Sequence, residues 1–225
     1  MSAPDYGSSF ALWRDSCPDP WQAYTRHAFV EGLGDGSLPR AAFLNYLRQD
    51  YLFLIHFSRA WSLAVVKAGN LTEMRAASAT VHGLLHMEMP LHVGICGAAG
   101  ISREALEATE EAPENLAYTR YVLECGYSGD FLDLLAALAP CVLGYGEIGM
   151  RLKSEARDTP YRDWIESYAS PEYQQLCRDT GALIDRAVAD RLGPAPETLP
   201  RWQVLAGRFA NATRLEAAFW GLGRA

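Results

Sequence analysis

Apolar residues recur at helical spacing along most of the chain. The clearest run follows Pro39, where Phe43, Leu47, Tyr51 and Leu54 lie three or four positions apart. This spacing places the side chains on one face of a helix. No stretch alternates apolar and polar residues in the way that a half-buried strand does. The sequence therefore predicts an all-α protein.

Turn and capping residues divide this pattern into helices. Asn70 and Ser170 stand where helix N-caps are expected, and Pro39 is expected in the first turn of its helix. The predicted helices cover residues 21–33, 37–69, 71–98, 103–109, 114–125, 130–154, 161–168, 170–192 and 202–220. Long helices joined by short turns favour a helical bundle. We expect a single domain over residues 1–225, with about 1–18 as an N-terminal extension.

A proline and two glycines interrupt the apolar helix that begins near Asp130. Pro140 costs about 3 kcal/mol in a helix interior, and Gly144 and Gly146 cost about 1 kcal/mol each relative to alanine. Packing alone does not account for three such residues, so we expect a kink and a widened space beside Cys141. Tyr145 follows four residues later and shares a face with the cysteine. The alternative is a kinked core helix with an inert buried cysteine.

Two carboxylates stand among large apolar side chains. Asp50 lies within a run of apolar residues, and Glu216 precedes Phe219 and Trp220. Such a carboxylate needs a partner, or acquires a raised pKa that suits a general acid or base. The alternatives are pairing of Asp50 with Arg48 or another helix, and an exposed position for Glu216.

Composition and charge exclude several classes of partner. The 225 residues carry a formal net charge of −7 without any basic run, which argues against nucleic acid. The most apolar long stretch is expected at Tyr51–Val66, which is too short to span a membrane. Residues 1–10 do not have the pattern of a signal peptide. The cysteine count is odd, which is typical of a reducing compartment, so we expect a cytoplasmic protein; the cysteines are Cys17, Cys96, Cys125, Cys141 and Cys177.

The histidines do not predict a helical metal site. All five lie in the N-terminal half of the chain, at positions 27, 56, 82, 86 and 92. Di-iron sites in helical bundles draw ligands from several helices, including a Glu-x-x-His motif on each of two. A multi-histidine metal centre is therefore not expected, whereas a single-histidine haem ligand stays open.

The motifs taken together resemble the TenA (thiaminase II) family, in its cysteine-bearing branch. The resemblance runs from about Trp21 to Trp220 and depends on the joint order of the fragments. These are Gly34-Asp35-Gly36-Ser37-Leu38-Pro39, Gln49-Asp50, Glu88-Met89-x-x-His92, Pro140-Cys141 with Tyr145 and Glu147-x-Gly149, Trp164-Ile165-x-x-Tyr168, and Glu216-x-x-Phe219-Trp220.

The resemblance implies a haem-oxygenase-like helical bundle that forms a homotetramer. It also implies hydrolysis of 4-amino-5-aminomethyl-2-methylpyrimidine to the hydroxymethyl compound, with cleavage of thiamin as a further activity, and no cofactor. Cys141 would be the nucleophile, Asp50 would hold the ring nitrogen and exocyclic amine, and Glu216 would shuttle protons. Tyr145 and Tyr168 would line and polarise the pocket.

Two further residues complete the implied substrate site. Tyr118 would close on the pyrimidine ring, and Phe53 would pack against it. Some relatives in this branch carry a tyrosine where this chain has Phe53, so we expect a less acidic Cys141 here.

Two other functions remain open from the sequence. Haem-dependent and di-iron oxidases share the bundle, and a metal analysis with an absorption spectrum would reveal them. A non-catalytic regulator or ligand-binding protein is the other alternative, which a mobility-shift titration would test.

Overall fold

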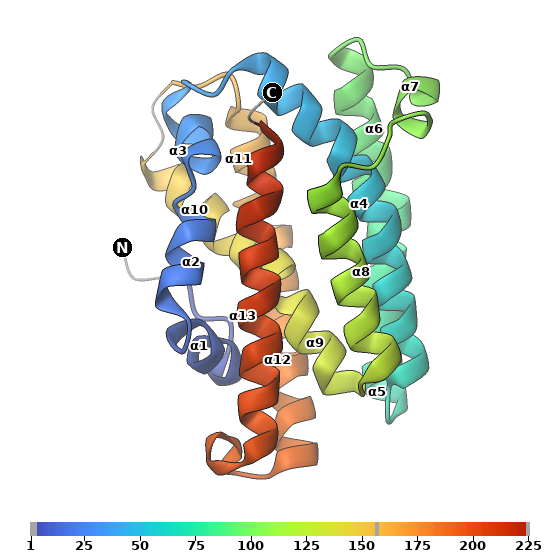
Figure 1. Cartoon of the computed structure of the whole chain (residues 1–225), viewed down its shortest axis with the longest axis vertical. Coiled ribbons are helices and arrows are strands. Elements are labelled where there is room, and N and C mark those ends of the chain that lie inside the picture. The colour runs from blue at the N-terminus through green and yellow to red at the C-terminus, as the bar shows by residue number, and fades with distance from the viewer. Residues whose placement is uncertain (1–3, 156–157, 224–225) are drawn as a thin grey trace. The chain divides into compact units, whose positions relative to one another are not determined.

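The computed structural model describes residues 4–155 and 158–223, and these residues form helices and connecting turns with no strand among them (Figure 1). The predicted all-α class is confirmed. The contacts divide the chain into two compact units. The first comprises Met1–Leu38 and Leu135–Trp220, and the second comprises Pro39–Leu134 and Gly221–Ala225. The single domain over residues 1–225 stays a prediction.

The first unit is built around α13, which packs against α1 and α2. Within the same unit, α12 packs against α1 and α10, and α10 packs against α11. The elements are α1 (Ser8–Asp15), α2 (Pro18–Thr25), α3 (Ala28–Asp35), η2 (Pro140–Gly144), α10 (Tyr145–Glu155), α11 (Arg162–Tyr168), α12 (Pro171–Leu192), η3 (Pro196–Thr198) and α13 (Pro200–Trp220).

The second unit is built around the long helix α4, which contacts α5, α6 and α8 (Figure 1). The boundary between the units falls inside α9 (Phe131–Ala139). The elements of the second unit are α4 (Arg40–Lys67), α5 (Leu71–Gly83), η1 (Leu84–Glu88), α6 (Met89–Ala98), α7 (Arg103–Glu107), α8 (Pro113–Ser128) and η4 (Gly221–Gly223).

Capping side chains begin several helices where the sequence predicts them. The Asn70 side chain accepts a hydrogen bond from the Glu73 amide, and Ser170 accepts one from the Tyr173 amide. Each satisfies a backbone donor that the first helical turn leaves unpaired. Pro39 differs slightly from the prediction, since it is the N-cap of α4 and lies before the first turn.

The single helix predicted over Trp21–Leu33 is wrong. Two helices, α2 and α3, occupy this region, and the chain turns at Arg26 and His27. His27 has non-helical backbone angles, with φ −59° and ψ 148°, and its ring Nδ1 accepts a hydrogen bond from the Phe29 amide at 3.2 Å. This bond caps α3, so a new helix starts within the apolar pattern that suggested a continuous one.

The expected N-terminal extension contains an ordered helix that the sequence analysis did not predict. Phe10 and Trp13 of α1 are buried. The Asp185 carboxylate of α12 accepts hydrogen bonds from the Ser8 and Ser9 amides, at 2.9 and 2.8 Å. This segment is therefore part of the first unit's core.

The longest apolar helix is also different from the one expected. By length and composition, one helix among the described residues could cross a membrane, and it is Phe131–Glu155 rather than Tyr51–Val66. Of its apolar window, 89% is buried inside the protein, which is the pattern of a core helix.

Candidate functional site

Cys141 lies in η2, a π-helical turn between α9 and α10. The interruption of the helix predicted at Pro140 is this π turn. Side chains of the first unit donate to carbonyl groups of the turn: the Tyr24 hydroxyl to Pro140 at 3.2 Å, and the Tyr173 hydroxyl to Val142 at 3.2 Å. Such bonds stabilise the altered backbone, and π turns occur frequently at functional sites.

The glycines near Cys141 have a packing role that the sequence analysis had discounted. A Cβ atom on Gly144 would lie 2.3 Å from a ring carbon of Tyr24. One on Gly146 would lie 2.6 Å from the Cys177 sulfur and 2.7 Å from the Tyr6 hydroxyl. Both glycines therefore admit side chains from other helices against the turn, and they are not by themselves evidence for a pocket.

Cys141 is half-buried within an otherwise buried stretch. Residues 131–140 are all buried, and so are residues 142–146. The other four cysteines are buried as well, and burial raises the pKa of Cys96 to about 11 and that of Cys177 to about 12. Inert burial, the alternative considered for Cys141, describes those thiols better than it describes Cys141.

Aromatic rings surround Tyr145 on the turn that follows Cys141. The Tyr145 ring centroid lies 4.9 Å from that of Tyr168, 5.9 Å from Trp164 and 5.3 Å from Trp220. Tyr168 is half-buried, whereas Tyr145 is buried. Tilted ring contacts of this kind build a rigid aromatic surface. The structure thus brings the two predicted pocket tyrosines into contact.

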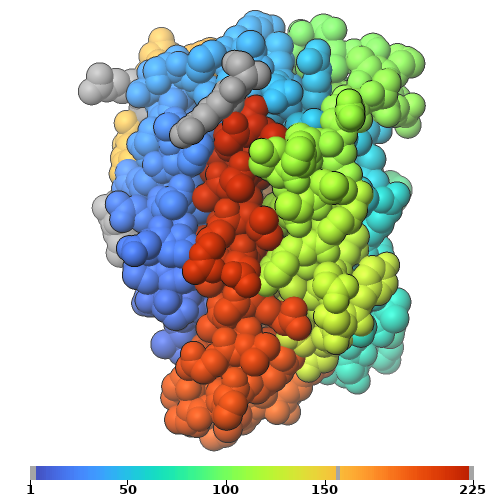
Figure 2. All heavy atoms as spheres, viewed as in Figure 1, coloured from blue at the N-terminus to red at the C-terminus, as the bar shows by residue number. Residues whose placement is uncertain are grey.

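Glu216 is buried on α13, with 1% of its surface exposed. The exposed positions of this helix form a separate stripe, and the red atoms of α13 are visible at the surface in Figure 2. The exposed positions are Pro200, Gln203, Val204, Gly207, Asn211, Arg214 and Ala218. The alternative in which Glu216 is exposed is therefore wrong. In the same unit, η2 packs against both α12 and α13.

Asp50 is buried in the second unit and is paired with another helix, not with Arg48. Its Oδ2 atom lies 3.4 Å from His92 Nδ1 on α6, and the Tyr46 hydroxyl donates to the same oxygen at 3.4 Å. Burial raises the pKa of Asp50 to about 7, against which the Tyr46 hydrogen bond acts. A carboxyl group with a pKa near neutrality can either hold or release a proton.

Phe53 lies one turn after Asp50 and stacks on Tyr118. Their ring centroids are 5.2 Å apart, with 29° between the planes. Phe53 also stacks on Phe57, and the centroids of these two rings are 5.2 Å apart. Phe53 and Tyr118 are both buried. The predicted contact residues Asp50, Phe53 and Tyr118 therefore belong to one packed region of the second unit.

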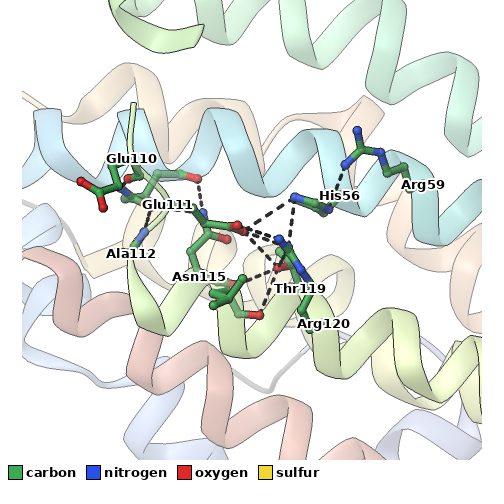
Figure 3. Close-up of polar contacts among 10 residues, drawn as sticks. His56, Arg59, Glu110, Glu111, Ala112, Asn115, Thr119 and Arg120 are labelled. Atoms are coloured by element: carbon green, nitrogen blue, oxygen red, sulfur yellow. Dashed lines mark hydrogen bonds and ion pairs between the residues drawn. The ribbon is translucent and has the colours of Figure 1, made fainter. Parts of the chain in front are cut away.

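Gln49 forms hydrogen bonds that the sequence analysis did not predict. Its side chain donates to the Glu110 carbonyl at 2.9 Å and accepts from the Ala112 amide at 3.0 Å. Asn115 Nδ2 donates to the Gln49 carbonyl at 2.8 Å (Figure 3 shows this region). Gln49, which precedes Asp50 in α4, thus ties α4 to the start of α8, the helix that carries Tyr118. Its only sequence signal is the Gln49-Asp50 pair.

A charged cluster extends this polar region. Arg120 and Glu111 form an ion pair at 2.8 Å, and His56 Nε2 lies 3.1 Å from Arg120 Nη1 (Figure 3). On its other side, His56 contacts Arg59 at 3.1 Å. Burial and the neighbouring arginines lower the pKa of His56, while Glu111 raises it. The ion pair between Glu111 and Arg120 thus ties the segment before α8 to α8 itself.

Glu147, part of the Glu147-x-Gly149 motif, anchors the N-terminal helices. Arg14 of α1 forms an ion pair with it at 2.6 Å, and the Trp21 indole donates to it at 3.1 Å. Burial raises the Glu147 pKa, and the bonds from Arg14 and Trp21 oppose that effect. Its place in the motif is therefore explained by packing between α10, α1 and α2.

The predicted site residues fall into two groups. Cys141, Tyr145, Tyr168 and Glu216 belong to the first unit, and Asp50, Phe53 and Tyr118 belong to the second. Among the described residues, no group of three or more His, Cys, Asp or Glu side chains could hold a metal ion. His82 and His86 are exposed, with ring centroids 4.6 Å apart.

A profile of the TENA/THI-4/PQQC family matches residues 15–224, nearly the whole chain. The chain belongs to this family. The chain is 38% identical over 205 residues to an aminopyrimidine aminohydrolase of Halalkalibacterium halodurans, covering 90% of this chain and 89% of that protein.

Solved structures agree with the family assignment. A TenA family transcription regulator from Silicibacter sp. TM1040 is 60% identical, with a TM-score of 0.96 and coverage of 97% of both chains. A domain of unknown function from Shewanella denitrificans OS217, with a heme oxygenase-like fold, has a TM-score of 0.71 at 13% identity, over 98% of this chain and 92% of that one. The predicted haem-oxygenase-like fold is confirmed.

Proposed function

We propose that this TENA/THI-4/PQQC family member is a thiamin-salvage hydrolase that acts on aminopyrimidines, with Cys141 as its nucleophile. The reaction converts 4-amino-5-aminomethyl-2-methylpyrimidine to the hydroxymethyl compound, and thiamin is a second substrate. A relative that is 38% identical carries the name aminopyrimidine aminohydrolase. The observation that carries the role of Cys141 is its partial exposure in a helix that is buried before and after it.

Covalent catalysis removes the main difficulty of this reaction. The leaving group sits on a methylene attached to the pyrimidine, where direct displacement by water is slow. The Cys141 thiolate adds to the ring, and the electron-rich adduct expels the amine from the methylene carbon. Water then adds to that carbon and the thiolate leaves, which restores the aromatic ring and the free enzyme.

Glu216 handles the protons of the leaving group and of the water. A buried carboxyl group is suited to this role, because burial favours its protonated form and a protonated carboxyl can donate to the departing amine. After the amine leaves, the carboxylate can accept a proton from the incoming water. General acid–base catalysis of this kind supplies about 10²- to 10⁴-fold in rate.

Asp50 and the aromatic residues bind the pyrimidine. The Asp50 carboxyl pairs with the ring nitrogen and the exocyclic amine, and Phe53 and Tyr118 pack against the ring. Tyr145 and Tyr168 supply the polar aromatic contacts near Cys141. None of these steps uses a metal or an organic cofactor, and the protein acts as a cytoplasmic homotetramer.

Product analysis tests this function. Native protein and the Cys141→Ser variant are each incubated with the aminomethylpyrimidine and with thiamin, and the hydroxymethylpyrimidine and ammonia or thiazole are measured. Native protein should release the hydroxymethylpyrimidine, and the variant should not. Absence of product from both substrates with native protein would contradict the proposal.

The solved protein from Silicibacter sp. TM1040 is described as a TenA family transcription regulator, which gives a second candidate function. It is 60% identical to this chain, so DNA binding is a specific alternative. The net charge of −7 opposes it, because a DNA-binding surface needs clustered basic residues. A mobility-shift titration distinguishes the two: tight, sequence-specific binding would favour the regulator.

A further inference from the structure

One ring nitrogen of His92 has a fixed role. His92 Nε2 lies 2.7 Å from the backbone carbonyl oxygen of Leu47. A carbonyl oxygen only accepts hydrogen bonds, so Nε2 must carry the hydrogen. In the neutral imidazole the other nitrogen, Nδ1, is then a pure acceptor.

This assignment limits the proton on Asp50. Nδ1 lies 3.4 Å from Asp50 Oδ2. A carboxylate and a bare Nδ1 are both acceptors, so they attract each other only when one proton lies between them. Two arrangements satisfy this condition: a neutral Asp50 that donates to neutral His92, or an imidazolium that donates to a carboxylate.

The surroundings favour the neutral arrangement. Both side chains are buried, which penalises any charged form. Burial raises the pKa of Asp50 to about 7 and lowers the pKa of His92. Hydrogen bonds from Tyr46 to Asp50 and from His92 to Leu47 act in the opposite direction.

Other titratable groups near Asp50 point the same way. Glu88 has a pKa raised to about 7 by burial and by the charge of Asp50. Cys96 lies on α6, as His92 does. Burial and Asp50 raise the pKa of Cys96 to about 11, and Arg48 opposes this shift. A negative charge on Asp50 is therefore disfavoured by its acidic neighbours as well as by burial.

We propose that His92 is a positioning residue that keeps Asp50 protonated by sharing one proton with it, so that Asp50 meets its ligand as a neutral carboxylic acid. This inference rests on the proposed function only for the identity of the ligand. In the free protein the O–H of Asp50 points to His92 Nδ1. When the ligand binds, this O–H turns to the ring nitrogen, and the other carboxyl oxygen accepts from the exocyclic amine of a 4-aminopyrimidine.

The shared proton also has a place in the reaction. Addition of the thiolate places negative charge on the ring nitrogens. The O–H bond of Asp50 breaks as an N–H bond forms on the ring, and the proton returns to Asp50 when the thiolate leaves. The number of protons on the Asp50–His92 pair is therefore the same before and after turnover.

The first test needs no substrate. Native protein with ¹⁵N-labelled histidine is titrated by NMR from pH 5 to 8, and the His92 signals are assigned with His92→Gln. We expect His92 to stay neutral with its hydrogen on Nε2 throughout this range. An imidazolium at pH 7, or a hydrogen on Nδ1 of the neutral ring, would overturn the proposal whether or not the protein is a hydrolase.

The second test separates a proton-sharing role from a structural one. His92→Leu removes the Nδ1 acceptor and offers no other, so the protonated form of Asp50 loses a hydrogen bond. Since one hydrogen bond is worth about one pKa unit, the alkaline limb of the kcat/KM profile for the aminopyrimidine should move down by about one pH unit. His86→Leu, at an exposed histidine earlier in the same run of helix, is the control and should leave the alkaline limb in place.

A uniform loss of activity in His92→Leu, with an unmoved alkaline limb, would reduce His92 to a packing residue and overturn the proposal. If native protein has no hydrolase activity at all, the proposed function fails, and the NMR titration still decides the proton arrangement. The two failures are therefore distinguishable.

Discussion

Individual side chains carry most of what the structure adds to the sequence. The sequence identified Asp50 as a buried carboxylate in need of a partner, but it could not choose between Arg48 and another helix. The partner, His92, is 42 positions away on α6 and is brought close by the packing of α6 on α4. Glu216 was equally ambiguous, because a single glutamate among apolar residues can lie on either face of a helix.

Asp50 should make the stability of the protein depend on pH. Its pKa rises from 3.8 to about 7 on folding, so between these values the folded state binds more protons than the unfolded state. Stability from this group is therefore full below pH 4 and falls as the pH rises towards 7.

The Asp50→Asn variant cannot titrate at this position. Its stability relative to native protein should therefore increase as the pH rises from 4 to 7, as measured by urea unfolding at several pH values. Glu88→Gln should show the same trend, since burial and Asp50 raise the Glu88 pKa from 4.5 to about 7. A relative stability of Asp50→Asn that decreases with pH would mean that Asp50 is a paired carboxylate.

At the level of elements, local signals predicted helix starts better than helix interruptions. Asn70 and Ser170 cap helices as predicted, because these residue types satisfy free amides. The break at His27 was missed because histidine is not a common N-cap. The π turn at Leu84–Glu88 was missed because its apolar spacing still matches a continuous helix.

The π turn beside Cys141 gives a prediction about packing. Gly144→Ala places a methyl group 2.3 Å from the Tyr24 ring and should destabilise the protein by about 1–3 kcal/mol. Gly207→Ala is the matched control, since a Cβ at this exposed position in α13 meets nothing within 4 Å. The control should stabilise the helix by up to about 1 kcal/mol. Equal effects of the two substitutions in urea unfolding would contradict this account.

At the level of the whole molecule, the sequence predicted the fold class and the family, and the comparisons confirmed both. It also selected seven site residues, which the structure describes as two sets in two compact units. The order of motifs made the family evident. The supporting contacts of Gln49 and Glu147 were not predictable, because they join segments 61 and 133 residues apart.

The homotetramer is a prediction at this scale. Light scattering coupled to size exclusion should give a mass of about four times the 24.8 kDa chain. A mass that stays near 24.8 kDa at the concentration used for activity measurements would contradict it.

The central claim is that Cys141 performs the chemistry, and one rate comparison tests it most directly. Ammonia release from 4-amino-5-aminomethyl-2-methylpyrimidine is measured for native protein, Cys141→Ala and Cys17→Ser. Cys17 is a buried thiol at the start of α2, so its substitution controls for loss of a cysteine elsewhere in the same unit. We expect Cys17→Ser to retain activity and Cys141→Ala to lose it while remaining folded. Native-like ammonia release by Cys141→Ala would contradict the account.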